Sequence, residues 1–456
     1  MQAVSVFWHR RDLRLEDNAG LYHALKSDHS VLPIFIFDTH ILDKLEDKDD
    51  ARVSFIHREL GRIHQELEAL GSSIQVYYGK PEEIWPKLLD TYEVKAVYAN
   101  HDFEPYALER DGKIRELLDT RDVPFHTYKD HVIFEKDDVL KDNGTPYTVY
   151  TPYSKKWFKK LDSEMVRVPT KDGGEEEISK FLQSFPNGEY FGNFVEISPT
   201  QIPSLADMGF EPTSIEFPPS SVTRGLIRNY GETRNFPAVP GTSRLGLHYR
   251  FGTISIREKA RNSRSLSWNY INELCWRDFY AMILSHFPHV IGNPFREKYK
   301  YLDFRNNEKE FEAWCNGQTG YPIVDAGMRE LNQTGYMHNR VRMIVASFLT
   351  KHLLIDWRWG EAYFARKLLD FDLASNNGGW QWAAGCGSDA AHYFRVFNPE
   401  SQMKKFDKEL KYVRQWVPEY GTPAYQAPIV DHKMARERCL RVYKESLNRA
   451  AEIMEG

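Results

Sequence analysis

The sequence predicts two folded parts: an N-terminal α/β domain built on a doubly wound parallel sheet, followed by a mostly α-helical domain. Three observations predict this division. Short β-branched runs alternate with amphipathic helical segments over the first 130 residues, a stretch rich in Pro, Gly, Ser and charge follows, and strand alternation is missing after residue 225. A chain of 456 residues is also long enough to bury more than one hydrophobic core.

The expected strands of the first domain are four apolar runs: AVSVFW at 3–8, VLPIFIFD at 31–38, IQVYYG at 74–79 and VKAVYAN at 94–100. Between the second and third runs, apolar residues from Val53 to Leu70 recur at spacings of three and four, and Gly71 is placed to end the helix. Strands that alternate with helices of this length favour a parallel sheet with right-handed crossovers.

We therefore expect an α/β domain over residues 1–130, a connector over 131–225 and a helical domain over 226–456. Helical patterns in the last part include YPIVDAGMRELNQTG at 321–335 and RVRMIVASFLTKHLLIDW at 340–357.

Several classes of protein are disfavoured by missing motifs. None of the four Cys belongs to a CxxC pair and no HExxH occurs, so we expect no metal site. No GxGxxG follows a strand, and no P-loop or GxSxG is found, which argues against dehydrogenase, P-loop and hydrolase chemistry. No apolar run approaches the roughly 18 residues that span a membrane, and the few cysteines suggest a reduced, cytoplasmic protein.

The net charge of −5 conceals a difference between the two halves of the chain. Residues 1–200 carry 26 Lys and Arg against 37 Asp and Glu, whereas residues 201–456 carry 34 against 28. Eight of the 11 Trp also lie in the second, basic half. Such asymmetry hints at a polyanionic partner, although on charge alone an ordinary solvated surface explains it better.

The segment with the most functional residue types is RWGEAYFARKLLDFDLASNNGGWQWAAGCGSDAAHYFRVFNP, residues 358–399. It combines Asp370 and Asp372 with the amide pair at 376–377, a Gly-Gly step, and Trp380 and Trp382 on either side of a Gln. Asp and Asn present hydrogen-bonding groups to a polar heterocycle, and Gly permits close approach, so this composition suits a planar cofactor. Any single Trp is more simply explained as part of a helical core.

Two further segments carry weaker signals. In GTSRLGLHYRFGTIS, at 241–255, Thr242, Ser243 and Arg244 precede a helical pattern and suit either a pyrophosphate or an ordinary helix cap. In WNYINELCWRDFY, at 268–280, Glu273 is followed at spacings of three and four by Trp276 and Arg277 on one helical face. A buried carboxyl beside an indole has a raised pKa and can donate a hydrogen bond while neutral.

Seven motifs together resemble the DNA photolyase/cryptochrome family, most closely the class I photolyases that repair cyclobutane pyrimidine dimers. They are HRRDLRLEDN at 9–18, EPYALERD at 104–111, GTSRL at 241–245, ELCWRDFY at 273–280, TGYPIVDAGMREL at 319–331, MHNRVRMIVASFL at 337–349 and DFDLASNNGGWQWAAGCGSDAAHYFRVFNP at 370–399. The resemblance covers essentially the whole chain.

The resemblance implies an N-terminal antenna domain and a helical domain that holds FAD at the floor of a cavity. A pyrimidine dimer flipped out of DNA enters this cavity, and an electron from light-excited reduced FAD splits it. The alternative is a blue-light photoreceptor, a cryptochrome without repair activity. The chain ends at Gly456 soon after its last helical pattern, leaving no signalling tail, and the His338-Asn339 step departs from the paired His of six-four photolyases, so dimer repair is favoured.

The resemblance also implies roles for individual residues. FAD would be contacted by Tyr230, Thr242, Ser243, Arg244, Leu245, Gly246, Tyr270, Glu273, Arg277, Tyr336, Asn339, Arg342, Asp370, Asp372 and Asn376, the last facing flavin N5. The flipped dimer would meet Glu273, Trp276, Asn339, Met343 and Trp382, with Asn376 beside the reaction, while Arg234, Arg340, Arg395 and Lys404, with Trp276 and Trp382, would bind DNA. Trp380 and Trp357 would carry electrons to the flavin.

The sequence departs from the family pattern at four of these functional positions. Phe304 replaces the outermost Trp of the electron-transfer chain, so we expect slow photoreduction or a substitute donor such as Tyr301 or Trp359. Tyr270 and Tyr336 replace Trp near the FAD, and Gly246 replaces Ser, which weakens the inference for those three contacts.

A second, light-harvesting chromophore is also implied by the resemblance. Phe35, Arg52 and Asp102 match positions that hold a deazaflavin, whereas Tyr106 and Ala107 replace the Asn-Glu pair that holds a folate. We therefore expect a deazaflavin-like antenna rather than a folate, or none. The expected partner is damaged DNA, duplex or single-stranded, bound by a monomer that does not associate with membranes.

Overall fold

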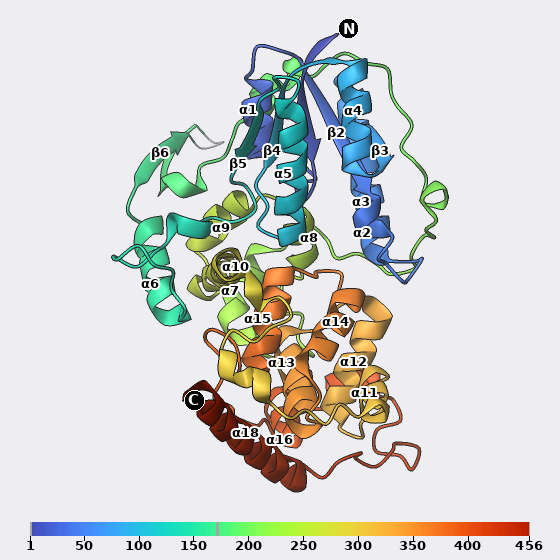
Figure 1. The fold of residues 1–456 in the computed structure, drawn as a ribbon, viewed down its shortest axis with the longest axis vertical. Helices are drawn as coiled ribbons and strands as arrows, with labels where there is room; N and C mark the ends of the chain where they lie inside the picture. The colour runs from blue at the N-terminus through green and yellow to red at the C-terminus, as the bar shows by residue number, and fades with distance from the viewer. Residues whose placement is uncertain (1, 170–172, 456) are drawn as a thin grey trace. The chain divides into compact units, whose positions relative to one another are not determined.

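The computed structural model describes residues 2–169 and 173–455 of the chain (Figure 1). These residues form two compact units, each assembled from separate segments. Unit 1 comprises Met1–Val139, Lys156–Ser221 and Arg244–Ser265, and unit 2 comprises Leu140–Lys155, Val222–Ser243 and Leu266–Gly456. Most of the segment expected to be a connector thus belongs to unit 1, and its residues 170–172 lie outside the described residues.

Unit 1 contains a five-stranded parallel sheet, which confirms the α/β prediction. Strands β1 (Ala3–His9), β2 (Val31–Asp38), β3 (Gln75–Gly79), β4 (Glu93–Asn100) and β5 (Phe125–Tyr128) lie in the order β3-β2-β1-β4-β5. In the central strand, Phe7 pairs with Pro33 of β2 on one side and Tyr98 of β4 on the other. The four apolar runs of the sequence correspond to β1 to β4. Strands β1 and β2 are buried on both faces and are therefore apolar without alternation, whereas the edge strand β3 is largely half-buried.

The helices that connect these strands are α1 (Ala19–Leu25), α2 (Thr39–Leu42), α3 (Ala51–Glu68), α4 (Pro81–Thr91) and α5 (Pro105–Asp119). Helix α3 begins where the Asp50 carboxylate accepts from the backbone N–H of Arg52 at 2.9 Å. It buries Val53, Leu60, Ile63 and Leu67, most of the face that the spacing predicts, whereas Leu70 lies beyond the helix and is exposed. Gly71 follows with a φ of +75°.

A network of buried charges joins distant segments of unit 1. Arg257 lies in α9 (Ile256–Arg264), and its guanidinium contacts Asp17 at 2.9 Å and Asp130 at 2.8 Å. Arg14 also contacts Asp130 at 2.8 Å. Because these groups are almost fully buried, each charge requires its partner, and α9 is thereby fixed to the segments that follow β1 and β5. Unit 1 is completed by β6 (Met165–Pro169), its antiparallel partner β7 (Glu175–Ser179), α8 (Gly246–Phe251) and the short turns η1 (Lys136–Asp138), η2 (Lys180–Leu182), η3 (Asn187–Asn193) and η4 (Ala206–Met208).

Unit 2 is helical, as predicted, and no strand occurs among its described residues. Its helices are α7 (Arg224–Thr233), α10 (Trp268–His286), α11 (Glu308–Cys315), α12 (Pro322–Thr334), α13 (Asn339–Ser347), α14 (Trp357–Lys367), α15 (Leu373–Ala384), α16 (Pro399–Phe406), α17 (Lys411–Trp416) and α18 (His432–Glu455), with short turns η5 (Pro288–Val290) and η6 (Glu297–Tyr301). Helix α6 (Tyr150–Leu161) begins in unit 2 and ends in unit 1.

The helical pattern at 340–357 is not one helix. Helix α13 passes into a π-helical turn, η7 (Phe348–His352), and the chain then leaves the helix at Leu354, where φ is +49°. The Asp356 carboxylate accepts from the backbone N–H of Arg358 at 3.0 Å and starts α14. Trp357 is therefore the first residue of a new helix, an arrangement that apolar periodicity does not reveal.

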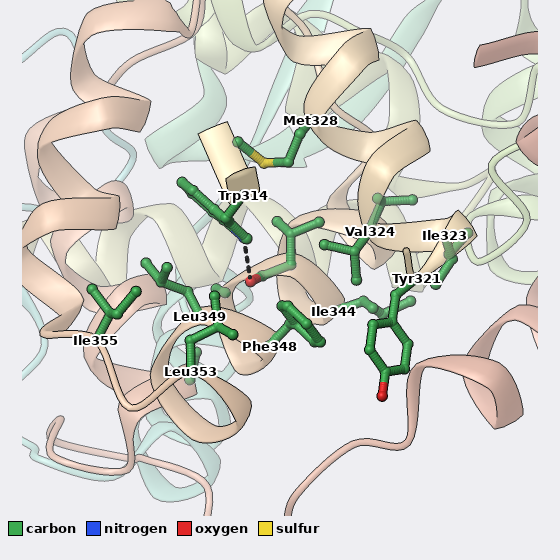
Figure 2. Packing of buried hydrophobic residues seen from close by; sticks show 14 of the residues in the cluster. Trp314, Tyr321, Ile323, Val324, Met328, Ile344, Phe348, Leu349, Leu353 and Ile355 are labelled. Carbon is green, nitrogen blue, oxygen red and sulfur yellow. Dashed lines mark hydrogen bonds between the residues drawn. The ribbon is translucent and has the colours of Figure 1, made fainter. Parts of the chain in front are cut away.

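The core of unit 2 lies around Trp314, whose indole N–H donates to the backbone oxygen of Val345 at 3.1 Å (Figure 2). Figure 2 shows Tyr321, Ile344 and Phe348 packed nearby, all of them buried. Fully burying such side chains contributes roughly 1.5–3 kcal/mol each. This core holds α13 and α15 in fixed positions, and both helices contribute to the cavity described below.

None of the helices in the described ranges combines the length and apolar character required to cross a bilayer. Within the same ranges, no three His, Cys, Asp or Glu side chains gather closely enough to hold a metal ion.

Candidate functional site

A cavity of about 460 Å³ opens among the helices of unit 2, within the size range of ligand and cofactor sites. Its walls come from α10, α13, α15 and the chain between α14 and α15. Many residues that the sequence singles out meet here: Arg234, Glu273, Trp276, Arg277, Asn339, Arg340, Arg342, Met343, Asp370, Asp372, Asn376, Trp380 and Trp382.

An arginine and a carboxylate form a charged part of this cavity. The Arg342 guanidinium donates to Asp370 Oδ2 at 2.8 Å and to the backbone oxygen of Met337 at 2.7 Å. Burial opposes the charge of Arg342, but the Asp370 carboxylate outweighs it and raises the pKa of the guanidinium. Asp370 Oδ1 is buried and has no hydrogen-bond partner among the described residues. A buried carboxylate oxygen without a partner is costly, so this atom is suited to accept from a ligand.

Helix α15 presents amide and carboxyl groups to the same cavity. It begins at Asp372, whose carboxylate accepts from the backbone N–H of Ser375 at 3.0 Å. One turn later, the Asn376 side-chain N–H₂ donates to the backbone oxygen of Glu361 at 3.1 Å, which fixes the amide in the cavity wall. A Cβ added to Gly379, which also lines the cavity, would meet no protein atom within 4 Å.

The second residue of the amide pair points elsewhere. Asn377 donates to the backbone oxygen of Val290 at 3.0 Å and to Glu361 Oε1 at 3.1 Å, and Gln381 donates to Asn377 and to two backbone oxygens. Neither residue lines the cavity. Their hydrogen bonds hold α15 against the chain at 290–293, so both support the site rather than face a ligand.

Helix α10 places one face toward the cavity. Its first turn is capped by Ser267, which accepts from the backbone N–H of Tyr270 at 3.3 Å. Glu273, Trp276 and Arg277 line the cavity together with Tyr280, which the sequence reasoning missed although it lies four residues after Trp276.

Glu273 is paired with a cation at the cavity wall. Burial raises the pKa of its carboxyl above the ordinary value, as expected from the sequence, and a hydrogen bond from Arg234 opposes this effect. The ion pair with Arg234 was not expected, because Arg234 follows the end of α7 and lies 39 positions before Glu273.

Tryptophan side chains form the aromatic part of the cavity wall. Trp276 and Trp382 are partly exposed, whereas Trp380 is buried and packs at right angles to Phe364, with ring centroids 5.0 Å apart. A Cβ at Gly360 would lie 2.1 Å from the Trp380 ring, so only glycine allows α14 to approach it this closely.

The two expected electron-transfer residues are both buried. Trp380 lies in the cavity wall and Trp357 begins α14. The Trp380 ring also contacts Trp314, with centroids 6.0 Å apart. Phe304 packs against the hydrophobic core around Trp314, and the Trp359 and Phe311 ring centroids are 5.2 Å apart.

Some predicted FAD contacts lie outside the cavity lining. Thr242 Oγ1 and the Tyr336 hydroxyl are 3.1 Å apart, and the Tyr230 and Tyr270 rings meet edge to face at 5.3 Å. Burial, and next the charge of Glu273, raises the pKa of Tyr230. Tyr230 is therefore close enough to the cavity wall to feel the charge of a residue that lines it. Ser243 belongs to unit 2 as well, whereas Arg244, Leu245 and Gly246 are assigned to unit 1.

Positive charge gathers at the rim. Burial, together with the neighbouring charges of Arg234 and Arg395, lowers the pKa of Arg340. Its guanidinium donates to Asn235 Oδ1 at 2.7 Å and lies over the Phe406 ring. Arg395 and Lys404 are exposed.

The residues expected to hold an antenna chromophore already have partners within unit 1. The Arg11 guanidinium, 3.1 Å away, holds the pKa of Asp102 well below its usual range although burial opposes this. Arg52 donates to Asp50 at 2.9 Å, and Phe35 is buried against Phe37. A smaller cavity of about 290 Å³ lies elsewhere in unit 1, lined by His40, Lys44, Glu82, Tyr106, Glu109, Arg110, Lys113 and Ile114.

A charged, tryptophan-walled cavity among helices, in a chain that also has a parallel α/β unit, has the composition of a site for a planar cofactor. A family model described as the FAD binding domain of DNA photolyase matches residues 270–423, and one described as DNA photolyase matches residues 5–172. The chain belongs to the DNA photolyase/cryptochrome family.

Individual relatives agree with this assignment. A deoxyribodipyrimidine photo-lyase of Synechococcus sp. is 36% identical over 98% of this chain and 97% of its own length, and that of Escherichia coli is 33% identical over 96% and 98%. Among solved structures, a bacterial class III photolyase from Agrobacterium tumefaciens superposes with a TM-score of 0.83 at 31% identity, covering 98% of both chains. An archaeal photolyase from Sulfolobus tokodaii with two FAD molecules gives 0.80 at 34%, covering 98% of this chain and 100% of its own.

Proposed function

We propose that the protein is a deoxyribodipyrimidine photo-lyase that uses light to repair cyclobutane pyrimidine dimers in DNA. One observation carries the proposal. A single cavity contains both a charged part suited to a flavin, at Arg342 and Asp370, and an aromatic part suited to extruded bases, at Trp276 and Trp382. Curated relatives with this activity align over nearly the whole chain.

FAD fits the charged part of the cavity. The unpartnered Asp370 Oδ1 offers an acceptor, Arg342 offers a compensating positive charge, and Gly379 leaves open space in the wall. When bound, reduced FAD supplies the light-driven electron that splits the dimer. Asn376 and Asp372 would orient the cofactor by hydrogen bonds, and the buried Trp380 would exclude water from one side of it.

The aromatic part of the cavity would receive the dimer. Flipping a nucleotide pair out of the duplex costs a few kcal/mol, least where the lesion already disturbs stacking, and base–aromatic stacking returns roughly 1–3 kcal/mol per base. Trp276 and Trp382 would provide that stacking, Glu273 would hydrogen-bond a pyrimidine edge, and Asn339 and Met343 would complete the pocket.

Cations around the cavity would hold the DNA backbone on either side of the lesion. Arg234 and Arg395 lie close enough to Arg340 that their charges, together with burial, lower the pKa of Arg340, and this supports a phosphate-binding role for the three arginines. The exposed Lys404 would add a fourth cation. Lys and Arg bind phosphates whatever the base sequence, so these contacts would position the duplex while the cavity recognises the lesion. Because Arg234 is also bonded to Glu273, it would couple phosphate binding to the dimer pocket.

The proposal also includes five finer points: membership of class I, electron transfer through Trp380 and Trp357, a deazaflavin-like antenna, a monomeric state and residence in the cytoplasm. The antenna is the least supported, because Asp102 and Arg52 are bonded within unit 1. One solved relative carries a second FAD, which makes a flavin-type second chromophore worth testing.

Repair is tested by illuminating the purified, reduced protein with duplex DNA that contains one thymine dimer and measuring restored thymines. We expect light-dependent restoration and none in the dark. Flavin that responds to light without any restoration would favour the alternative, a photoreceptor of the cryptochrome type.

A further inference from the structure

Tyr150 contacts the cavity wall from outside the region that the FAD-binding family model matches. It is the first residue of α6, and the segment Leu140–Lys155 that contains it belongs to unit 2 although α10 begins more than 100 residues later. The Tyr150 ring lies parallel to the indole of Trp276, with ring centroids 3.4 Å apart and planes inclined by 7°.

The Tyr150 side chain is fixed at several points. Its hydroxyl donates to Asn272, at 2.7 Å from Oδ1 and 3.0 Å from the backbone oxygen, one helical turn before Trp276. Its backbone N–H donates to Asp389 Oδ2 at 3.1 Å, and its ring meets the edge of Phe279 at 5.6 Å. The residue is 7% exposed, so its ring has little freedom to move.

The parallel contact leaves only one indole face available. An aromatic ring has two faces, and Tyr150 covers one face of Trp276. Trp276 lines the cavity and Tyr150 does not, so the side of the indole away from Tyr150 is the side presented to the cavity. Tyr280, which also lines the cavity, inclines toward the indole at 32° with centroids 5.6 Å apart.

We propose that Tyr150 is a positioning residue for lesion recognition: it holds the Trp276 indole from behind, in the orientation that stacks on an extruded pyrimidine pair. This inference rests on the proposed function. Stacking requires a flat ring held at a fixed angle, and an indole that loses the parallel ring behind it can tilt into the space that this ring occupied. The effect should therefore appear in binding of the dimer, not in the yield once the dimer is bound.

The test compares Tyr150→Leu, which removes the ring, with Tyr150→Phe, which keeps the ring and removes the hydroxyl. Tyr153→Leu is the matched control, because Tyr153 lies one turn later in α6, is even more deeply buried and packs on Phe279 with ring centroids 5.2 Å apart. Affinity is measured by fluorescence anisotropy for an oligonucleotide with one thymine dimer and for the same oligonucleotide without it. Dimers split per absorbed photon are measured at saturating protein.

We expect Tyr150→Leu to weaken dimer binding about tenfold, the loss of roughly one base stack, while binding of undamaged DNA stays within about twofold. The photon yield of the saturated complex should not change. Tyr150→Phe and Tyr153→Leu should keep the preference of the original chain for the dimer. If Tyr150→Leu loses its flavin or its near-ultraviolet circular dichroism, Tyr150→Met takes its place with the same expectation, because the longer, flexible Met side chain adapts to the space without supplying a ring.

A double-mutant cycle separates positioning of Trp276 from a general effect on the fold. In a Trp276→Ala background, Tyr150→Leu should weaken dimer binding no further. The proposal is overturned if Tyr150→Leu keeps full dimer affinity, if its effect persists undiminished in the Trp276→Ala background, or if Tyr153→Leu has the same effect. If the protein without substitutions binds dimer-containing and undamaged DNA with equal affinity, the proposed function is refuted, and this inference with it.

Discussion

Two adjacent glycines of α15, Gly378 and Gly379, allow a sharp test of how the cavity is built. A Cβ added to Gly378 would lie 2.2 Å from both Cδ1 and Cε1 of Tyr280, which no real Cβ contact permits, so alanine there must rotate Tyr280 or separate α15 from α10. A Cβ added to Gly379 would meet no protein atom within 4 Å and would point into the open cavity.

The two substitutions should change the free energy of unfolding in opposite directions. Alanine in place of glycine within a helix stabilises by roughly 0.5–1 kcal/mol, and Gly379→Ala should show this gain. Overpacking costs roughly 1–3 kcal/mol, so Gly378→Ala should be less stable than Gly379→Ala by about that amount. Urea unfolding of the flavin-free protein, followed by circular dichroism, measures the difference.

The Gly379→Ala variant should gain stability but lose ligand affinity. Because the Gly379→Ala methyl group occupies cavity space, the variant that is more stable without ligand should bind FAD or dimer-containing DNA less tightly than the original chain. Equilibrium dialysis with FAD and anisotropy with DNA measure the two affinities. Equal stability of the two variants, or full affinity of Gly379→Ala for both ligands, would refute this description of the cavity.

Three further predictions concern charge and electron transfer. Asp370→Asn should weaken FAD binding by at least about tenfold, because a charged hydrogen-bond acceptor is lost and Arg342 is left without its counter-ion. The control Asp303→Asn, which removes a charge from an exposed ion pair, should leave FAD affinity unchanged. Equilibrium dialysis measures the FAD affinity of both variants. Burial lowers the pKa of Lys351 from 10.5 to about 8. Between about pH 8 and pH 10.5, the lysine therefore carries a proton in the unfolded chain but not in the folded chain, so the free energy of unfolding rises with pH over this range. The unfolding free energy of the original chain should therefore increase relative to Lys351→Met by roughly 1–3 kcal/mol between about pH 7 and pH 10, and a constant difference would contradict the buried charge. Phe304→Trp should accelerate light-driven flavin reduction, followed by bleaching of flavin absorbance, and an unchanged rate would show that Phe304 does not limit it.

The parts of the fold that the sequence predicted are those governed by short-range periodicity. Apolar runs that alternate with helical segments identified β1 to β4, and spacings of three and four identified most of the buried face of α3 and the cavity face of α10. The helix-end signal was equally local, since Gly71 follows α3 with a φ of +75°.

Features that depend on distant residues were not predictable in this way. The break at Leu354 needs a backbone conformation that helical periodicity does not encode, and Asn377 turns inward because Val290 lies beside it in space. The Glu273–Arg234 pair and the Tyr150–Trp276 stack each join segments that no local pattern relates. Family motifs supplied the candidate residues, and tertiary packing decides which of them share one cavity.

A crystal structure of the protein bound to DNA with a thymine dimer would locate both the flavin and the lesion. We expect electron density for FAD beside Asp370 and Arg342, and for an extruded pyrimidine pair against Trp276 and Trp382. Flavin bound elsewhere, or a dimer that remains stacked in the duplex while side chains fill the cavity, would contradict this expectation.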